Sequence, residues 1–203
     1  MAEKHVACRK FQPLQALTAQ SRRFSKDDEG TTAIEFAMVL APFLGFTFGI
    51  IAVGLHYLAT NSLERAVYDA SRQIRTGQAQ QANMNADQFK TLVCNLAAPH
   101  IDCSKLQIHM SSYDSWAQVQ PPNCIDGKTQ ELTQGASGSG PITNEVGGAS
   151  KKVLVTACYD WTVAKYLPYI VFDGSGNRRQ ASQLSSGGML LQASAVFQTE
   201  PYE

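Results

Sequence analysis

The sequence predicts an α+β protein: a long N-terminal transmembrane helix followed by a small extracytoplasmic domain. We expect that domain to combine an antiparallel sheet of about three to four strands with a short helix. Three observations predict this arrangement. No Asp, Glu, Lys or Arg lies between Glu35 and Glu64, helical periodicity continues from there to Gly77, and three later segments alternate apolar with polar residues. Such alternation is typical of a sheet with one face buried and the other in water.

Length and charge limit the classes of function. The chain has 203 residues, which fits one modest domain with additional segments. It carries 17 basic and 17 acidic residues, so its formal net charge is zero. A nucleic-acid partner requires a basic face or stripe. We therefore expect no nucleic-acid partner.

The apolar run predicts a membrane span at about residues 36–58, because about 20 apolar residues are enough to cross the hydrocarbon core. A cleaved secretory signal has a shorter apolar stretch, of about 7 to 15 residues, and a small-residue cleavage site. This run is longer, and no clean A-x-A follows it. The lipid bilayer is therefore a predicted partner.

Basic residues near the two ends of the span predict its orientation, because they collect on the cytoplasmic side. The nearby residues after the span are Arg65, Arg72 and Arg75, whereas those before it are more numerous: Lys4, Arg9, Lys10, Arg22, Arg23 and Lys26. The N-terminus is then cytoplasmic. Residues 1–30 form a polar leader, 31–77 the long helix, and 78–203 the disulfide-stabilised extracytoplasmic domain.

The long helix should end near Gly77, which follows Arg75 and is a common C-terminal signal. Three residues inside it concern helix packing. Pro42 favours a kink, although membrane helices tolerate proline. Gly45 and Gly49 form a G-x-x-x-G pair, which lets another helix approach closely, but this spacing is also common in membrane helices by composition alone.

The outer domain begins with DQFKTLVCNLAA, which predicts a short amphipathic helix ending before Pro99. Alternation predicts strands around LQIHM, across KKVLVTACYDW and near Leu191 to Phe197. The Gly/Ser/Thr-rich segment at about 127–150 is expected to be a mobile loop. A second loop surrounds FDGSGNRRQ. Its start resembles a calcium loop, but the later acidic ligand is absent, so we expect a plain turn.

The cysteines agree with the orientation. Cys8 falls on the reducing side and leaves an even set on the oxidising side, Cys94, Cys103, Cys124 and Cys158. Four cysteines allow three pairings, and the sequence alone does not decide among them. We favour Cys94 with Cys103, a short local clasp, and Cys124 with Cys158. A zinc site with His100 and His109 is the competing interpretation, against which the C-x-x-C pairs are missing.

No catalytic constellation is recognisable in the sequence. G-x-S-x-G, a P-loop, G-x-G-x-x-G between a strand and a helix, and H-E-x-x-H are all absent. The four histidines are scattered. We expect no catalytic residue, no cofactor and no metal.

Glu35, at the start of the apolar run, has two interpretations. Thr32 to Glu35 reads T-x-x-E, a capping box in which the carboxylate satisfies a free backbone N–H and is favoured by the positive helix end. That interpretation does not account for Gly30 directly before the helix or for Phe36 after the glutamate. The segment GTTAIEF resembles the processing site of type IV prepilins, which a membrane-embedded prepilin peptidase cuts after the glycine.

The resemblance implies a role for each of these residues. Cleavage after Gly30 would free an amine at Thr31. Glu35 would then be the fifth and Phe36 the sixth residue of the mature chain. Glu35 would pair with the amine of a neighbouring subunit and so set the register between packed helices. A buried carboxylate is tolerable only when paired, which makes such a partner chemically reasonable.

More of the chain resembles the TadE-like family, pseudopilins of the tight-adherence (Flp-type) type IV pilus system. The similar segments are GTTAIEFAMVLAPFL with its long helix, the VC and DC at Cys94 and Cys103, KKVLVTACYDW, and LLQASAVFQTEPY. The major pilin of this pilus system is very short and this chain is far too large for that role, so the resemblance implies a minor or initiating subunit. Its implied partners are the prepilin peptidase, other pilins and pseudopilins, and the inner-membrane assembly platform.

These observations predict a non-enzymatic bacterial inner-membrane protein that takes part in assembling a fibre used in surface attachment. Its C-terminal domain would be periplasmic, or incorporated into the pilus. Two other classes stay open. One is an unprocessed single-pass anchor whose outer domain binds a partner or acts as a scaffold. The other is a tethered extracytoplasmic enzyme, which would need a catalytic cluster assembled from distant residues.

Overall fold

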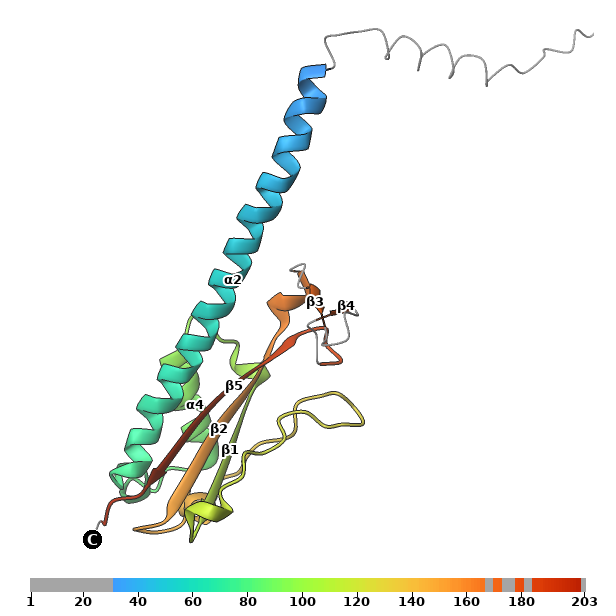
Figure 1. Ribbon diagram of the computed structural model, residues 1–203. Coiled ribbons are helices and arrows are strands. Elements are labelled where there is room, and N and C mark those ends of the chain that lie inside the picture. The colour runs from blue at the N-terminus through green and yellow to red at the C-terminus, as the bar shows by residue number, and fades with distance from the viewer. Residues whose placement is uncertain (1–30, 167–169, 173–177, 181–183, 202–203) are drawn as a thin grey trace, which may run out of the picture. The chain divides into compact units, whose positions relative to one another are not determined.

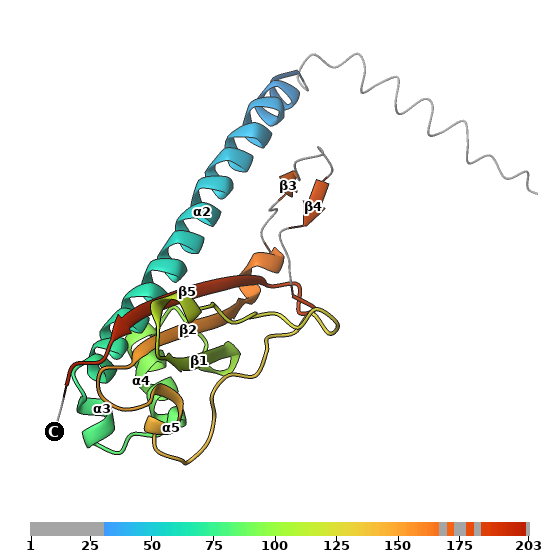
Figure 2. The same ribbon diagram turned by 60° about the horizontal axis from the view of Figure 1, so that its bottom comes forward.

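The structure is a computed structural model that describes residues 31–166, 170–172, 178–180 and 184–201. The chain divides into two compact units, residues 1–50 and 51–203. Figure 1 labels helices α2 and α4 and the strands, and Figure 2 also labels α3 and α5. The elements are α2 (Thr31–Arg75), α3 (Gln78–Gln81), α4 (Ala86–Ala97), η2 (Cys103–Lys105), β1 (Leu106–Tyr113), η3 (Trp116–Gln118), α5 (Thr143–Val146), β2 (Lys152–Trp161), η4 (Thr162–Tyr166), β3 (Ile170–Phe172), β4 (Arg178–Gln180) and β5 (Met189–Gln198).

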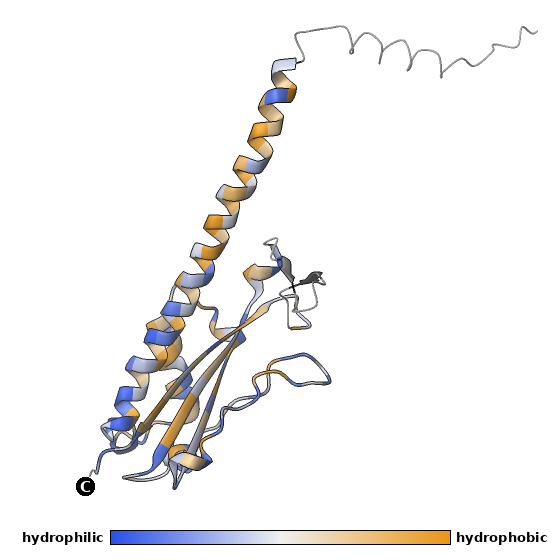
Figure 3. Cartoon of the chain, in the orientation of Figure 1, coloured by the Kyte–Doolittle hydropathy of each residue, from blue (hydrophilic) through white to orange (hydrophobic). Residues whose placement is uncertain are grey.

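Helix α2 confirms the predicted long helix. It runs without a break through Pro42 and ends at Arg75, two residues before the predicted stop signal. Gly77 has a positive φ of 78°, which glycine adopts without the cost that a side chain would bring. In Figure 3 the apolar residues of α2 dominate its N-terminal part, and polar residues recur toward its C-terminal end.

In the second unit, one stripe of α2 is buried. The stripe follows the helical period and consists of Ala59, Leu63, Ala66, Val67, Ala70 and Ile74. These side chains belong to one core that also includes Phe89 of α4 and Val155 of β2. Figure 2 shows the sheet with these two helices on the same side of it. This part of α2 is therefore a core element of the outer domain.

The main sheet is antiparallel and has three strands in the order β1-β2-β5. Leu106 to Tyr113 pair with Tyr159 to Lys152, and Lys152 to Trp161 pair with Gln198 to Met189. All three predicted strands are confirmed. The central strand β2 is almost continuously buried because α2 and α4 cover one face and the loop with Cys124 reaches the other.

Two features differ from the sequence-based expectations. The FDGSGNRRQ region was expected to be a loop, but Ile170–Phe172 and Arg178–Gln180 pair as a second, two-stranded sheet. Asp173, Ser175 and Asn177, the residues that resemble a calcium loop, lie outside the described residues. The segment at about 127–150 contains helix α5, and its Leu132 forms a bridge with Ile125, just before the segment. Its mobility stays a prediction.

Helix α4 confirms the predicted amphipathic helix. Asn85 is its N-cap and accepts a hydrogen bond from the Gln88 N–H at 2.7 Å, while the Gln88 Oε1 accepts one from the Asn85 N–H at 2.9 Å. This reciprocal capping box fixes where the helix starts. Its buried face carries Phe89 and Val93 into the core.

Candidate functional site

The N-terminal part of α2 is the candidate site, because it exposes large apolar side chains. Ile34, Phe36 and Phe43 are 60–65% exposed. Among the described residues, α2 is the helix long and apolar enough to cross a membrane, with a mean hydropathy of 2.2 over its most apolar window. Leaving such side chains in water costs about 25 cal/mol per Å². The helix therefore fits a single-pass membrane anchor.

Glu35 and Phe36 lie in the second turn of α2 and are exposed. The helix begins at Thr31, so Thr32 lies inside it and is not the N-cap that the capping-box interpretation requires. Among the described residues, neither Thr32 nor Glu35 makes a side-chain hydrogen bond or an ion pair. Gly30 lies outside the described residues. The local structure thus does not assign Glu35 the role of a cap.

The spacing of Thr31 and Glu35 has a chemical consequence. Residues four apart lie on the same face of a helix, with about 5–6 Å between their Cβ atoms. A free amine created at Thr31 would therefore lie on the same face as the Glu35 carboxylate. An amine from a neighbouring chain would have to approach this face.

Gly45 and Gly49 lie on an open surface of the helix. A Cβ atom placed at either position would have no neighbour within 4 Å. Packing within this chain therefore does not require glycine at these positions. A surface of this kind allows a second helix to approach closely.

Residues of α2 from His56 onward contact the rest of the outer domain. The rings of His56 and Trp161 lie 5.3 Å apart and are tilted by 57°. The Ser62 hydroxyl donates a hydrogen bond to the Ala97 carbonyl of α4 at 3.0 Å. Sequence reasoning missed both contacts, since they join residues far apart in the chain.

The outer domain contains two disulfides, and they pair the cysteines as the sequence analysis favoured. Cys94 of α4 is bonded to Cys103 of η2, and Cys124 is bonded to Cys158 of β2, with Cα–Cα distances of 5.6 and 5.7 Å. The first ties α4 to the start of β1, and the second ties the long loop to the central strand. Bonded cysteines offer no thiolate to a metal, so the zinc interpretation loses its sulfur ligands.

The surroundings of His109, in strand β1, shift the pKa of its side chain. Partial burial lowers the pKa of its imidazole, and its Nε2 lies 3.3 Å from the Thr133 hydroxyl. In the part of the chain that the structure describes, no three His, Cys, Asp or Glu side chains gather as metal ligands. The contact between His109 and Thr133 joins β1 to the loop that contains Thr133.

These observations define an α+β protein with a disulfide-bonded domain and an exposed apolar N-terminal helix that fits a single-pass membrane anchor. The family model described as TadE-like protein matches residues 30–72, which include the Gly30 junction and nearly all of α2. The match confirms the resemblance to the TadE-like family for this segment. No curated protein and no solved structure matches the chain.

Proposed function

We propose that this chain is a non-enzymatic minor pilin or pseudopilin that takes part in the assembly or initiation of a tight-adherence type IV pilus used in surface attachment. A prepilin peptidase would cut after Gly30. The new N-terminal helix would then join other pilins and the inner-membrane assembly platform. The observation that carries the proposal is the exposed apolar helix, with Glu35 near its start, inside the segment that matches the TadE-like family.

Electrostatics supports an assembly role for Glu35. An isolated charged residue costs about 2.5–3.5 kcal/mol at the centre of the bilayer by insertion scales, and less at the end of the span, where Glu35 lies. Pairing with an ammonium group relieves this cost and fixes the axial position of one helix against its neighbour. Phe36 would supply apolar contact next to the pair, because it is 65% exposed in the single chain.

Helix packing supports the same role. The surface that contains Gly45 and Gly49 has no neighbour within this chain. In a bundle of pilin helices it would receive the helix of another subunit. Pro42 lies between this surface and Glu35, where it removes one backbone hydrogen bond that a neighbouring helix or a local adjustment would satisfy.

The proposed location is the bacterial inner membrane, with the N-terminus in the cytoplasm. The basic residues of the leader support this orientation. The outer domain would lie in the periplasm, where disulfides form and persist. The two bonded cysteine pairs agree with such a compartment.

A second candidate is an unprocessed anchor whose outer domain binds or organises a partner. Asp27, Asp28 and Glu29 favour it, because many prepilins have a basic residue where this chain has an acidic one before Gly30. The variant Gly30→Ala separates the two functions. Pilin assembly predicts an uncut precursor and no fibre, whereas the anchor function predicts full activity of the variant.

Thr31→Ser is the matched control for that experiment. It keeps a small hydroxyl residue directly after the cleaved bond and changes neither Gly30 nor Glu35. We expect normal processing and normal fibres from it. Loss of fibres in the control as well as in Gly30→Ala would mean that the junction tolerates no change, and Glu35→Gln would then have to test the assembly role separately.

A further inference from the structure

The outer edge of β5 is open. Thr199, one residue after the strand, donates its N–H to the Lys151 carbonyl on the β2 side at 2.9 Å. Glu200 donates its N–H to the Arg75 carbonyl of α2 at 2.8 Å. Because successive strand residues direct their backbone groups to opposite edges, the alternation continues back along β5. The residues of β5 that direct N–H and C=O groups away from β2 are Leu190, Gln192, Ser194, Val196 and Gln198.

Those outward groups have no strand partner. In the part of the chain that the structure describes, β5 pairs with β2 alone. At the opposite edge of the sheet, an outward backbone group does have a partner. The Ala136 N–H donates a hydrogen bond to the outward Ile108 carbonyl of β1 at 2.7 Å. A side chain at Gly135 would collide with the backbone of Ile108, so glycine permits this close approach.

The sequence of β5, MLLQASAVFQ, lacks the usual protection of an exposed edge. It contains no charged residue, no proline and no glycine along ten residues. Native edge strands are usually shortened, bulged or supplied with lysine or proline, because an unprotected edge pairs with other chains. The β5 edge is therefore suited to pairing.

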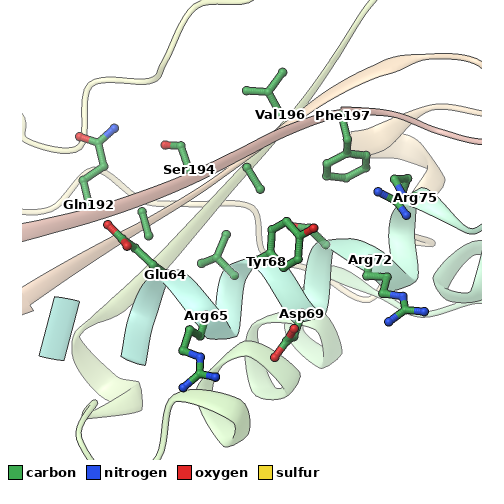
Figure 4. A pocket seen from close by; sticks show the side chains of 14 residues that line it. Glu64, Arg65, Tyr68, Asp69, Arg72, Arg75, Gln192, Ser194, Val196 and Phe197 are labelled. Atoms are coloured by element: carbon green, nitrogen blue, oxygen red, sulfur yellow. The ribbon is translucent and has the colours of Figure 1, made fainter. Parts of the chain in front are cut away.

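A groove of about 970 Å³ runs beside this edge, between α2 and β5 within the second unit (Figure 4). Its walls contain apolar, hydroxyl and charged side chains, among them Glu64, Tyr68, Ser71, Arg72, Arg75 and Phe197. Tyr68 is 67% exposed although it lines this groove. A fourth strand, about 4.8 Å from β5, would cover it.

Ser71 lines the groove and is buried. Its side chain is 3% exposed, and its hydroxyl has no hydrogen-bond partner among the described residues. Buried polar groups are nearly always bonded, and an unpaired one costs about 1–3 kcal/mol.

Charged side chains line both ends of the groove. Glu64 lies near Gln192 at the end where β5 begins, and Arg65 follows it in α2 (Figure 4). Arg72 and Arg75 lie at the other end, where Arg75 is already paired with Glu200 at 3.5 Å. Arg72 makes no ion pair within the described part of the chain. A complementary segment carries an acidic residue beside Arg72 and a basic residue beside Glu64.

We propose that this groove binds an extended segment of a partner polypeptide, which adds to the sheet as a fourth strand antiparallel to β5. The partner's acidic residue lies toward its N-terminal end, beside Arg72, and its basic residue lies toward its C-terminal end, beside Glu64. Its apolar side chains cover Tyr68 and Phe197. The proposal goes beyond the proposed function, because it holds whether or not the leader is removed.

The test uses the full chain in detergent micelles and a synthetic probe. The probe is a capped peptide of about eight residues, the length of an ordinary strand, with alternating valine and threonine between a first glutamate and a last lysine. Residue-resolved amide hydrogen exchange is measured with and without it. We expect slower exchange at Gln192, Ser194 and Val196, and no change at Ala193 and Ala195, which already bond to β2.

Two control peptides distinguish strand pairing from nonspecific binding. One carries N-methyl groups on the amides that face β5 and should bind at least about tenfold more weakly, since each lost hydrogen bond leaves a buried carbonyl unpaired. The other exchanges the glutamate and the lysine and should bind severalfold more weakly. Arg72→Glu should reverse the preference between the two charge patterns.

Variants of Val196 test the edge itself. Val196→Pro removes an outward N–H and should weaken the unmodified probe about tenfold. Val196→Thr is the matched control and should bind normally, because it keeps the N–H and the branched side chain. If Val196→Pro does not fold, the N-methylated peptide still decides the question.

Three results would overturn the proposal: no binding at millimolar probe, equal binding of the N-methylated peptide, or protection that does not alternate along β5. Concentration-dependent protection of the same amides without the probe would also overturn it. That result would make a second copy of this chain the occupant of the edge.

Discussion

Removing each disulfide tests how the outer domain is held together. The double variant Cys124→Ala with Cys158→Ala opens a loop with a sequence separation of 34, and Cys94→Ala with Cys103→Ala opens one with a separation of 9. The loop-entropy relation gives about 3.8 and about 2.6 kcal/mol near room temperature. The longer bridge should therefore stabilise the domain more, by about 1.2 kcal/mol.

The assay is guanidinium unfolding of the full chain in detergent, followed by tryptophan fluorescence. Trp161 is suited to report unfolding, because it is 3% exposed and contacts His56. We expect both variants to unfold at lower denaturant, the Cys124/Cys158 variant at the lowest. The reasoning is refuted if the Cys94/Cys103 variant loses more stability, or if neither variant shifts the midpoint.

Three further predictions follow from the packing and charge of the described residues. Leu63→Ala should cost about 2–5 kcal/mol of unfolding free energy, because Leu63 is 1% exposed in the core, whereas the exposed Leu58→Ala should cost little; an equal effect in guanidinium unfolding would contradict this placement. His109 has a folded-state pKa below its ordinary value, so protonation favours the unfolded chain. Stability should be complete above about pH 6.5 and fall as pH is lowered through the folded-state pKa, less so in His109→Gln; parallel pH profiles of the unfolding midpoint would be the contrary result. Gly49→Leu should leave the outer domain as stable as before, since a Cβ there meets nothing within 4 Å, but should reduce fibre formation; normal fibres on electron micrographs would count against helix packing at this surface.

Periodicity predicted the larger elements correctly. The helical spacing of Leu63, Ala66, Val67 and Ala70 continued α2 beyond the membrane span, and these residues form its buried stripe. The alternation in KKVLVTACYDW predicted β2, because a strand directs successive side chains to opposite faces. Such periodic patterns of apolar residues predict an element correctly when one face of that element packs against a core.

Short elements were not predictable in the same way. Ile170–Phe172 and Arg178–Gln180 are three-residue strands, too short to show alternation. Helix α5 has four residues inside a segment whose composition favours a loop. Such elements depend on the rest of the fold, as the bond from the Ile142 N–H to the Met84 carbonyl at 2.7 Å illustrates.

The candidate functional residues also differ in whether the sequence alone could predict them. Gly30, Glu35 and Phe36 were recognised from their order in the chain, which needs no tertiary structure. The groove beside β5 joins α2 to a strand more than a hundred residues later. Nothing local distinguishes Ser71 from any other serine in a helix, so its buried and unpaired hydroxyl is visible only in the folded chain.

The most direct test of the central claim is the N-terminus of the protein isolated from the membranes of its own host. Intact-mass and terminal-peptide analysis would measure it. The account predicts a chain that begins at Thr31, with the first 30 residues removed. A mature chain that retains the leader through Gly30 would contradict prepilin-type processing and favour the anchored binding protein.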